Sequence, residues 1–409
     1  MQSGSPATAS PDNVVVTGEP ECGHISLPRL LAEFMKMGCL AFGGGMAIIA
    51  FMEQELVRKR RVIAPDKFLN GVALGQVLGP MAVNTSFFVG YCLYGPVGGL
   101  LSLLAFVMPS VLLVIVIAWL YAANQSLVLL QAALAGLQPA VIALIASAAW
   151  SMGAKAVRRW PAAVLCAAGL AAGLGKLAPV YVLAAGGLCG VLLGSKRLLG
   201  AQPQDKTATG AKAAEAGSRQ GIAWPMLAFS AAPPAGLSLA HIAITFFKLG
   251  LVWFGGAYTI VPLMHQRIVG ELGWLNPATF RDGVAIANLT PGPMSVLATF
   301  AGYRVYGISG ALAATFALYV PATALMLFFC RNFQRMQIGG RTRDLLNGLN
   351  PCVVGLILSA GVLLSKGVLI NYTAWALVLA SFLLLVRFKW SPAYVLGVNA
   401  ALGVLLRMR

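Results

Sequence analysis

The chain has 409 residues, of which 59% are hydrophobic and only 10% are charged, with a formal net charge of +17 and a mean hydropathy of +0.81. A soluble protein carries about 25% charged residues, so the composition excludes a soluble enzyme and indicates an integral membrane protein. The positive charge fits the excess of Lys and Arg in cytoplasmic membrane loops. No extramembrane basic segment is long enough for a nucleic-acid-binding domain.

The first 27 residues are polar and lack the apolar stretch of a cleavable signal peptide, so we expect a disordered tail at 1–27. Apolar stretches follow that reach the roughly 20 residues of a membrane-spanning helix. The clearest of them are 97–121, 128–150, 309–330 and 345–364. Seven cysteines are scattered without CxxC spacing or a His at ligand spacing, so we expect no disulfide framework, no metal site and no cofactor.

The first apolar helix contains the stretch "KMGCLAFGGG", from Lys36 to Gly45. Each glycine weakens a helix by about 1 kcal/mol relative to alanine, and a lysine inside a bilayer costs roughly 2.5 kcal/mol or more. A second interruption, "LGP" at 78–80, falls inside the apolar segment 66–94. Proline breaks the helical hydrogen-bond ladder, and at membrane depth such breaks are tolerated only in a protein-lined cavity. Both stretches therefore predict interrupted helices around a buried site.

The sequence repeats itself at an offset of 212 residues. The stretch "FMKMGCLAFGGG" begins at Phe34, and "FFKLGLVWFGGA" begins at Phe246. The same register, with one inserted residue, continues through paired "GVA", "GPM", "GYCLYG/GYRVYG", "GLQP/GLNP" and "PVYVL/PAYVL" stretches. The chain is therefore predicted to hold two copies of one unit, at 28–196 and 240–409, joined by a polar linker and lead-in at 197–239.

The basic loops indicate that the two copies are inverted. In the first copy the loop "RKRR" at 58–61 is basic and the turn at 122–126 is uncharged. In the second copy the counterpart of that turn, 331–343, is strongly basic, and the counterpart of "RKRR", 266–282, is near neutral. Because basic loops stay in the cytoplasm, equivalent loops are expected on opposite sides of the membrane. Inverted repeats are common among secondary transporters.

Inversion requires an odd number of crossings in each unit. Between the basic loop and the uncharged turn lie two helical segments, so one of them must fail to cross. The segment 66–94, broken at 78–80, is the candidate, and its twin is broken by "TPGP" at 290–293. We therefore expect an all-α polytopic membrane protein with two inverted homologous repeats, each of about five spans plus a re-entrant helical hairpin.

Broken helices at the midplane can form an anion site without a charged side chain. The free backbone N–H groups and the positive dipole end of each half-helix attract an anion, and glycine lets the backbone approach closely. Three cations, Lys36, Lys248 and Arg304, accompany four such breaks, which favours a dianion. The predicted binding residues are Lys36, Phe42, Gly43, Gly44, Gly45, Gly79, Pro80, Asn84, Lys248, Phe254, Gly255, Gly256, Asn288, Thr290, Pro291, Gly292, Pro293, Ser295 and Arg304.

Structural explanations stay open for some of these residues. Glycines at GxxxG spacing, as in Gly71/Gly75/Gly79 and Gly186/Gly190/Gly194, usually form close-packing helix faces. Lys36 near the start of its helix can extend to the membrane interface, and Arg304 can act as an interfacial anchor.

With these motifs in place, the sequence resembles the bacterial chromate ion transporters. An "FGG" after the start of an apolar helix, a "PGP" hairpin and a following "GY…YG", present in two inverted copies, carry the resemblance. It implies an inner-membrane exporter of chromate, driven by the proton-motive force, that confers chromate resistance, with sulfate as a competing anion. The sequence leaves the oligomeric state open, and a homodimer is one arrangement. One departure is Leu78, which stands where the second hairpin has Pro291, so the two copies need not contribute equally.

Proton coupling requires a titratable group near the site. The candidates are Glu33, Glu53, Glu55, His265 and Asp282. Glu33 precedes Lys36 by one helical turn and is expected to pair with it. The hypothesis is that Glu53 or Glu55 carries the proton linkage, although both acids can also simply border the loop.

The alternatives to a chromate exporter are a membrane enzyme and a transporter of another small anion. A membrane enzyme would need a cluster of His, Asp, Glu or Cys on one face, which the sequence does not offer, and no Walker-A motif for ATP binding occurs. A transporter of sulfate, an organic carboxylate or another small anion is the stronger alternative. Inverted repeats with broken helices favour a carrier over a passive channel.

Overall fold

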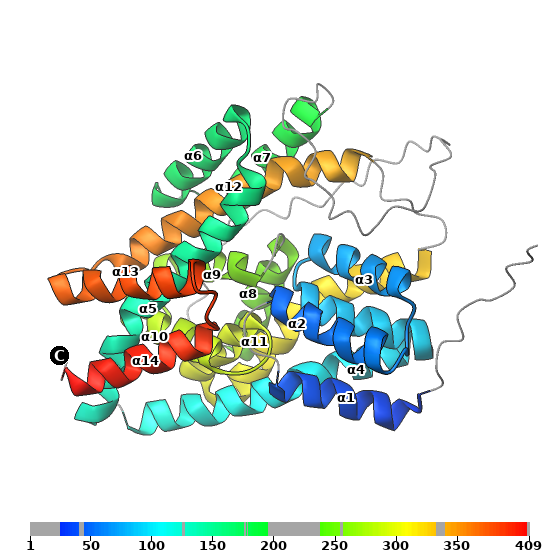
Figure 1. The fold of residues 1–409 in the computed structure, drawn as a ribbon, viewed down its shortest axis with the longest axis horizontal. Helices are drawn as coiled ribbons and strands as arrows, with labels where there is room; N and C mark the ends of the chain where they lie inside the picture. The colour runs from blue at the N-terminus through cyan, green and yellow to red at the C-terminus, as the bar shows by residue number, and fades with distance from the viewer. Residues whose placement is uncertain are drawn as a thin grey trace, which may run out of the picture.

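The computed structural model describes residues 25–40, 45–124, 127–175, 177, 179–194, 238–253, 257–332 and 340–406. Within these ranges every regular element is a helix (Figure 1). The first half contains α1 (Leu27–Leu40), α2 (Gly45–Met52), the π-helix η1 (Glu53–Lys59), α3 (Pro65–Val77), α4 (Met81–Ala123), α5 (Val128–Ala156), α6 (Trp160–Leu174) and α7 (Pro179–Gly194).

The second half repeats this order. Its elements are α8 (Leu239–Val252), the 3-10 turn η2 (Ala257–Thr259), α9 (Ile260–Met264), the π-helix η3 (His265–Glu271), α10 (Pro277–Leu289), the 3-10 turn η4 (Met294–Val296), α11 (Leu297–Asn332), α12 (Gly340–Ser365), α13 (Tyr372–Val386) and α14 (Pro392–Leu405).

Unusual backbone geometry recurs at the same offset as the sequence repeat. The π-helices η1 and η3 begin 212 residues apart. Inside the long helices α4 and α11, Gly95 and Gly307 kink the chain with φ of 65° and 63°, a left-handed conformation that glycine adopts without strain. These shared irregularities show that the sequence repeat is also a structural repeat.

The helices next to the broken segments of the two halves pack around one hydrophobic core. Helix α1 packs on α4, α8 packs on α11, and α4 packs on α11 across the two halves. A Cβ atom on Gly38 of α1 would lie 2.2 Å from the carbonyl oxygen of Phe106, and one on Gly250 of α8 would lie 2.2 Å from that of Leu318. Glycine is therefore required at both crossings, because any side chain would separate the helices.

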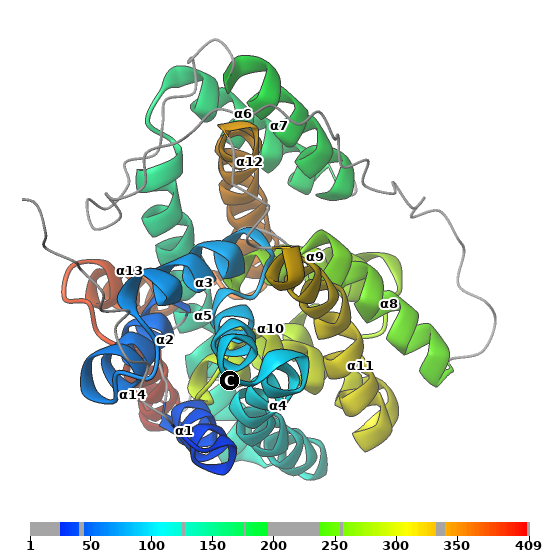
Figure 2. The same ribbon diagram turned by 90° about the vertical axis from the view of Figure 1, so that its right-hand side faces the viewer.

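The remaining helices are exchanged between the halves, which means that the helices of one half pack on helices of the other. Helix α5 packs on α13 and α14, whereas α12 packs on α6 and α7 (Figures 1 and 2). A Cβ on Gly136 of α5 would lie 2.2 Å from the carbonyl oxygen of Asn399 in α14, and one on Gly348 of α12 would lie 2.1 Å from that of Gly186 in α7. Gly186 therefore belongs to a close-packing face, as its GxxxG spacing predicted.

In the part of the chain that the structure describes, four helices are long and apolar enough to cross a membrane: Met81–Ala123, Val128–Ala156, Met294–Arg331 and Asn347–Ser365. They overlap the four clearest apolar stretches of the sequence. Shorter apolar helices are Trp160–Leu174, Tyr181–Leu192, Leu239–Val252, Tyr372–Val386 and Pro392–Leu405. The chain is thus an all-helical membrane protein built from two related halves.

Candidate functional site

The two predicted hairpins are interrupted where their Gly-Pro sequences fall. Helix α3 ends at Val77 and α4 begins at Met81, while α10 ends at Leu289 and η4 begins at Met294. Gly79 and Gly292 take φ of 114° and 102°, a conformation that residues with a side chain rarely adopt. Pro80 and Pro293 follow these glycines and lack an N–H group for continuing a helix. Each hairpin therefore turns at its glycine.

Each hairpin turn is packed against the other half of the chain. A Cβ on Gly79 would lie 2.4 Å from the carbonyl oxygen of Trp253, the residue that caps the end of α8. A Cβ on Gly292 would lie 1.9 Å from the Oγ of Ser110 in α4 and 3.7 Å from the carbonyl oxygen of Gly38 in α1. The two turns thus meet the helices that carry Lys248 and Lys36.

Buried polar side chains lie beside both turns. Asn84, one turn into α4, is fully buried, and neither its Oδ1 nor its Nδ2 hydrogen-bonds within the described part of the chain. The hydroxyl of Ser110, beside Gly292, likewise has no hydrogen bond among the described residues. Buried polar groups normally have partners, so these two side chains can receive a polar ligand.

The other predicted polar residues have protein partners. Asn288 accepts a hydrogen bond of 2.8 Å from the hydroxyl of Tyr258 and donates to the carbonyl of Val284. Thr290 donates to the carbonyl of Ala287, and the hydroxyls of Ser295 and Tyr319 are hydrogen-bonded to each other. These residues shape the second hairpin.

The predicted cations occupy different environments. Lys36 is exposed on α1, and Lys248 is half-buried on α8. The guanidinium carbon of Arg304 lies 5.4 Å from the centre of the Tyr121 ring. Arg304 is seven residues into α11, about 10 Å along the helix from its start at the hairpin turn. It therefore lies toward the opposite end of the hairpin from Gly292.

The predicted proton-coupling acids are held by basic partners near η1. Glu33 is ion-paired with Arg60, so the expected pairing with Lys36 is wrong: Glu33 lies on the buried face of α1, whereas Lys36 is exposed. Glu53 pairs with Arg58 at 2.9 Å and Glu55 with Lys59 at 2.6 Å.

The corresponding segment of the second half has the opposite charge order. In η3, Arg267 and Glu271 form an ion pair at the positions equivalent to Glu55 and Lys59. His265, equivalent to Glu53, lies edge-on to the Phe280 ring with 5.4 Å between centres. The two π-helices therefore share geometry but differ in charge.

A second polar cluster joins the two halves through Asp282. Its carboxylate Oδ2 accepts a hydrogen bond of 2.9 Å from the hydroxyl of Tyr121 near the end of α4. Asp282 is 6% exposed. The neighbouring Arg281 donates to the carbonyl oxygens of Leu364 at 3.2 Å and Lys366 at 3.3 Å. Arg281 is therefore directed toward the end of α12.

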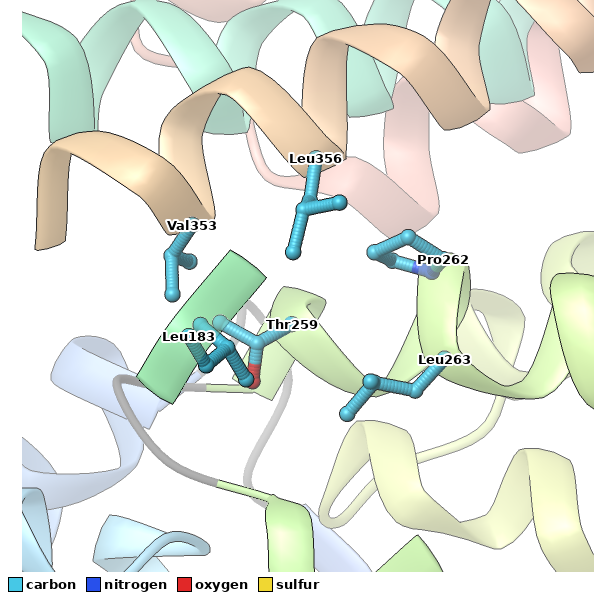
Figure 3. Close-up of a pocket in the computed structure, with 6 residues that line it drawn as sticks. All are labelled: Leu183, Thr259, Pro262, Leu263, Val353 and Leu356. Carbon is cyan, nitrogen blue, oxygen red and sulfur yellow. The ribbon is translucent and has the colours of Figure 1, made fainter. Parts of the chain in front are cut away.

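A small hollow lies between α7, η2, α9 and α12 (Figure 3). It is lined by Leu183, Thr259, Pro262, Leu263, Val353 and Leu356. Thr259 supplies the single hydroxyl among these six residues, so the hollow in this arrangement is suited to apolar contacts rather than to an anion. Among the described residues, no three His, Cys, Asp or Glu side chains gather as a metal site.

Comparison with known proteins identifies the family. The sequence model described as chromate transporter matches residues 28–191 and 240–404, once in each half. The chain belongs to the chromate transporter family. The chromate transport protein of Pseudomonas aeruginosa is 35% identical over 81% of this chain and 80% of its own. The probable chromate transport protein of Synechococcus elongatus is 32% identical over 83% and 85%, respectively.

A third relative in the chromate transporter family covers nearly the whole chain. The chromate transport protein of Cupriavidus metallidurans is 28% identical over 96% of both chains. No solved structure shows a significant match to this chain. Family membership confirms the resemblance drawn from the paired "FGG" and "PGP" motifs and the reading of the chain as a transporter rather than an enzyme.

Some of the predicted binding residues lie outside the described part of the chain. They are Phe42, Gly43, Gly44, Phe254, Gly255 and Gly256. Gly45 begins α2, and Pro291 lies in the turn between α10 and η4. The structure brings Gly79, Pro80 and Asn84 together at one turn, and Pro291, Gly292 and Pro293 at the other.

Sequence reasoning missed several residues around these turns. Ser110, Tyr121 and Trp253 were not singled out, because nothing in their local sequence shows that they meet residues of the other half. Arg281 offered one signal: together with Asp282 it forms a charged pair within an apolar hairpin segment. Charged residues in such segments are functional candidates by default.

Proposed function

We propose that this chain is a chromate efflux transporter of the bacterial inner membrane, driven by the proton-motive force and conferring chromate resistance. The observation that carries the proposal is the pair of glycine turns at Gly79 and Gly292 in a chain of the chromate transporter family. Each turn packs on the other half, beside a buried polar side chain that has no hydrogen bond to the described residues. Two relatives are named chromate transport protein and a third is named probable chromate transport protein.

The proposal includes an inverted topology with re-entrant hairpins. Helix α3 has 13 residues, about 20 Å at 1.5 Å per residue, which falls short of a hydrocarbon core of about 30 Å. The part of α4 before the Tyr94–Gly95 kink is similarly short. A helical hairpin with two such limbs can enter the membrane and return. The basic loops at 58–61 and 331–343 support opposite orientations of the two halves, with about five spans in each.

The anion is proposed to bind at the two turns. The first N–H groups of α4, Asn84 and the Ser110 hydroxyl supply hydrogen-bond donors, and the dipole of a helix N-terminus attracts negative charge. Lys36 and Lys248 lie on the helices that the turns touch, and Arg304 adds positive charge along α11. No metal or cofactor is involved in this proposal.

The membrane potential favours efflux of such an anion. Moving two negative charges out of a negative interior is downhill by about 4.6 kcal/mol at 100 mV. We propose that transport is an antiport in which protons enter, with Glu33, Glu53, Glu55, His265 and Asp282 as the titratable candidates. The second candidate function is transport of sulfate or another small anion, because the same donors would receive any tetrahedral dianion.

Flux of labelled chromate into everted membrane vesicles tests the proposal. We expect saturable uptake that increases with a proton gradient and that sulfate inhibits less strongly than unlabelled chromate. Uptake of sulfate without uptake of chromate would replace the substrate and leave the topology in place. Chromate flux that does not saturate would indicate a channel and contradict the carrier mechanism.

Replacing Asn84 should separate function from stability. In Asn84→Ala, a buried amide without a partner among the described residues is removed, so the protein is expected to keep or gain about 1 kcal/mol of stability. Chromate uptake should fall about tenfold or more, which corresponds to about 1.4 kcal/mol of lost binding. Thermal unfolding in detergent and vesicle uptake measure the two effects.

A buried asparagine in α14 provides the matched control. Asn399 donates hydrogen bonds to the Ser381 hydroxyl at 2.9 Å and to the Val395 carbonyl at 2.8 Å. Asn399→Ala should lower the unfolding temperature and leave the uptake per folded molecule near that of the wild type. Full uptake by Asn84→Ala would remove Asn84 from the proposed site.

A further inference from the structure

We propose that Asp282 is the proton-carrying group, and that it takes up a proton from external water before α4, α5 and α10 close around it. This inference rests on the proposed function and assigns its coupling step. In the structure Asp282 is 6% exposed, its Oδ2 accepts the Tyr121 hydrogen bond, and its Oδ1 has no hydrogen-bond partner recorded among the described residues.

Asp282 differs from Glu33, Glu53 and Glu55 in its surroundings, because the cation that acts on it, Arg281, is its neighbour in the chain and not an ion-pair partner. Glu33, Glu53 and Glu55 each form an ion pair with Arg or Lys, whereas the structure records no such ion pair for Asp282 within its described ranges. Arg281, next to it in the chain, is directed to the carbonyl oxygens at the end of α12. A buried carboxylate without an ion pair is costly, and the protonated carboxyl is far cheaper to bury. Closure around Asp282 therefore favours the protonated carboxyl over the carboxylate.

The surroundings of Asp282 contain few other groups that can compete for the proton. From α4 it faces Tyr121, and from α5 the uncharged Gln138. From α11 Arg304 lies over the Tyr121 ring, and from η3 His265 lies against Phe280 beside Arg281. Helix α14 contributes no charged side chain, and its Tyr394 is 73% exposed.

The position of Asp282 links elements that must move in a transport cycle. It lies near the start of a hairpin limb, and Tyr121 lies near the end of α4 at the uncharged turn, which the proposed topology places outside the cell. Helix α5 belongs to the exchanged helices that pack on α13 and α14. If the hairpin moves relative to α5, Asp282 becomes open to external water and its proton can exchange there.

The cluster exists in one half only. The residues at the equivalent positions of the first half are Asn70 for Asp282 and Cys92 for Arg304, and both are exposed. The amide of Asn70 cannot carry the proton. In this proposal, therefore, only the second half couples transport to protons. This asymmetry agrees with the departure of Leu78 from Pro291 in the hairpin motif.

The proposed step is a simple proton transfer. When Asp282 is open to external water it is a carboxylate, and a proton from that water binds to Oδ1. After closure, the protein reorients so that Asp282 faces the cytoplasm, and the proton is released to internal water. This release restores the carboxylate. Chromate leaves the cell in the return half of the transport cycle. No oxidant, reductant or covalent intermediate takes part.

Asp282→Asn tests the assignment in everted vesicles. Asparagine keeps the size and the acceptor for the Tyr121 hydroxyl but cannot release a proton. We expect gradient-driven uptake of labelled chromate to fall about tenfold or more. Proton release on addition of chromate, followed with a pH-sensitive dye, should fall by a similar factor. Exchange of labelled for unlabelled chromate without a gradient should persist. Asp66→Asn, at an exposed acid in the first turn of α3, is the matched control and should behave as wild type.

Each outcome has a defined meaning. Wild-type vesicles without chromate flux would overturn the proposed function itself. If the wild type transports chromate and Asp282→Asn retains full proton coupling, this inference alone is overturned. It is also overturned if a correctly inserted Asp282→Asn protein loses both chromate exchange and proton coupling. Loss of coupling in Glu53→Gln or Glu55→Gln, with coupling intact in Asp282→Asn, would assign the proton to η1.

Tyr121→Phe provides an independent variant if Asp282→Asn does not insert. It keeps the ring that faces Arg304 and Phe300 and removes the hydroxyl that donates to the carboxylate. Because that hydrogen bond favours the charged carboxylate, its loss should move the pH of half-maximal gradient-driven uptake to higher values. An unchanged pH profile would contradict the role of Asp282.

Discussion

Gly292→Ala is expected to abolish chromate uptake and to reduce the yield of folded protein strongly. The residue has a φ of 102°, and a left-handed backbone with a side chain costs roughly 1–2 kcal/mol. The added Cβ would also lie 1.9 Å from the Ser110 Oγ, so the hairpin turn must withdraw from α4. Gly79→Ala should have a similar effect, because its Cβ would meet the Trp253 carbonyl at 2.4 Å.

A second substitution distinguishes the steric effect from the backbone strain. Ser110→Gly removes both side-chain atoms that a Cβ on Gly292 would meet, and leaves the Gly38 carbonyl oxygen at 3.7 Å. The double variant Ser110→Gly with Gly292→Ala should therefore recover folded protein, as measured by size-exclusion chromatography in detergent. Uptake should remain low, because the site has lost the Ser110 hydroxyl.

Gly397→Ala is the matched control for the hairpin glycines. Gly397 lies within α14, and a Cβ there would meet no atom within 4 Å. Both folded yield and uptake should stay near the wild-type values. Normal uptake by Gly292→Ala alone would show that the turn tolerates a side chain, and would contradict the packing of the two halves at this point.

Local chemistry explains what the sequence could predict. The repeat offset, the hairpin breaks and the close-packing face at Gly186 all depend on Gly and Pro, whose backbone constraints act wherever they occur. The structure places positive-φ glycines at Gly79 and Gly292, within the "LGP" and "TPGP" stretches. Composition likewise sufficed to recognise a membrane protein.

Tertiary contacts explain what the sequence could not predict. Tyr121 and Asp282 are 161 residues apart in the chain and belong to different halves, so no local pattern connects them. Glu33 was expected to pair with Lys36 in its own helix, but it meets Arg60 after the chain has turned through α2 and η1. Arg304 was placed with the hairpin break on sequence order, whereas α11 carries it along to Tyr121.

The exchange of helices between the halves was also invisible in the sequence. A repeat with a linker is normally read as two adjacent units, each with its own core. Here α5 finds its partners in α13 and α14, and α12 finds its partners in α6 and α7. Two glycines that permit these crossings, Gly136 and Gly348, occur 212 residues apart. The sequence repeat therefore identifies the packing surfaces of α5 and α12. It does not indicate that each surface packs on helices of the other half.

This exchange predicts that neither half works alone. Splitting the chain after Gln220, within the polar linker, and expressing only one part should leave chromate uptake about tenfold or more below that of the intact chain. The first half alone lacks α13 and α14 against α5, and the second lacks α6 and α7 against α12. Co-expression of the two parts should restore uptake, because the packing surfaces are complete once both are inserted.

Two copies of the first half are not expected to replace the intact chain by associating with each other. The first half could offer α7 to the α5 of a second copy, since Gly190 and Gly403 occupy equivalent positions beside Gly348 and Gly136. The second copy would then have to insert upside down, against the orientation set by its basic loops. It would also have Asn70 and Cys92 in place of Asp282 and Arg304. Gradient-driven uptake by the first half alone would therefore contradict both the helix exchange and the one-sided coupling cluster.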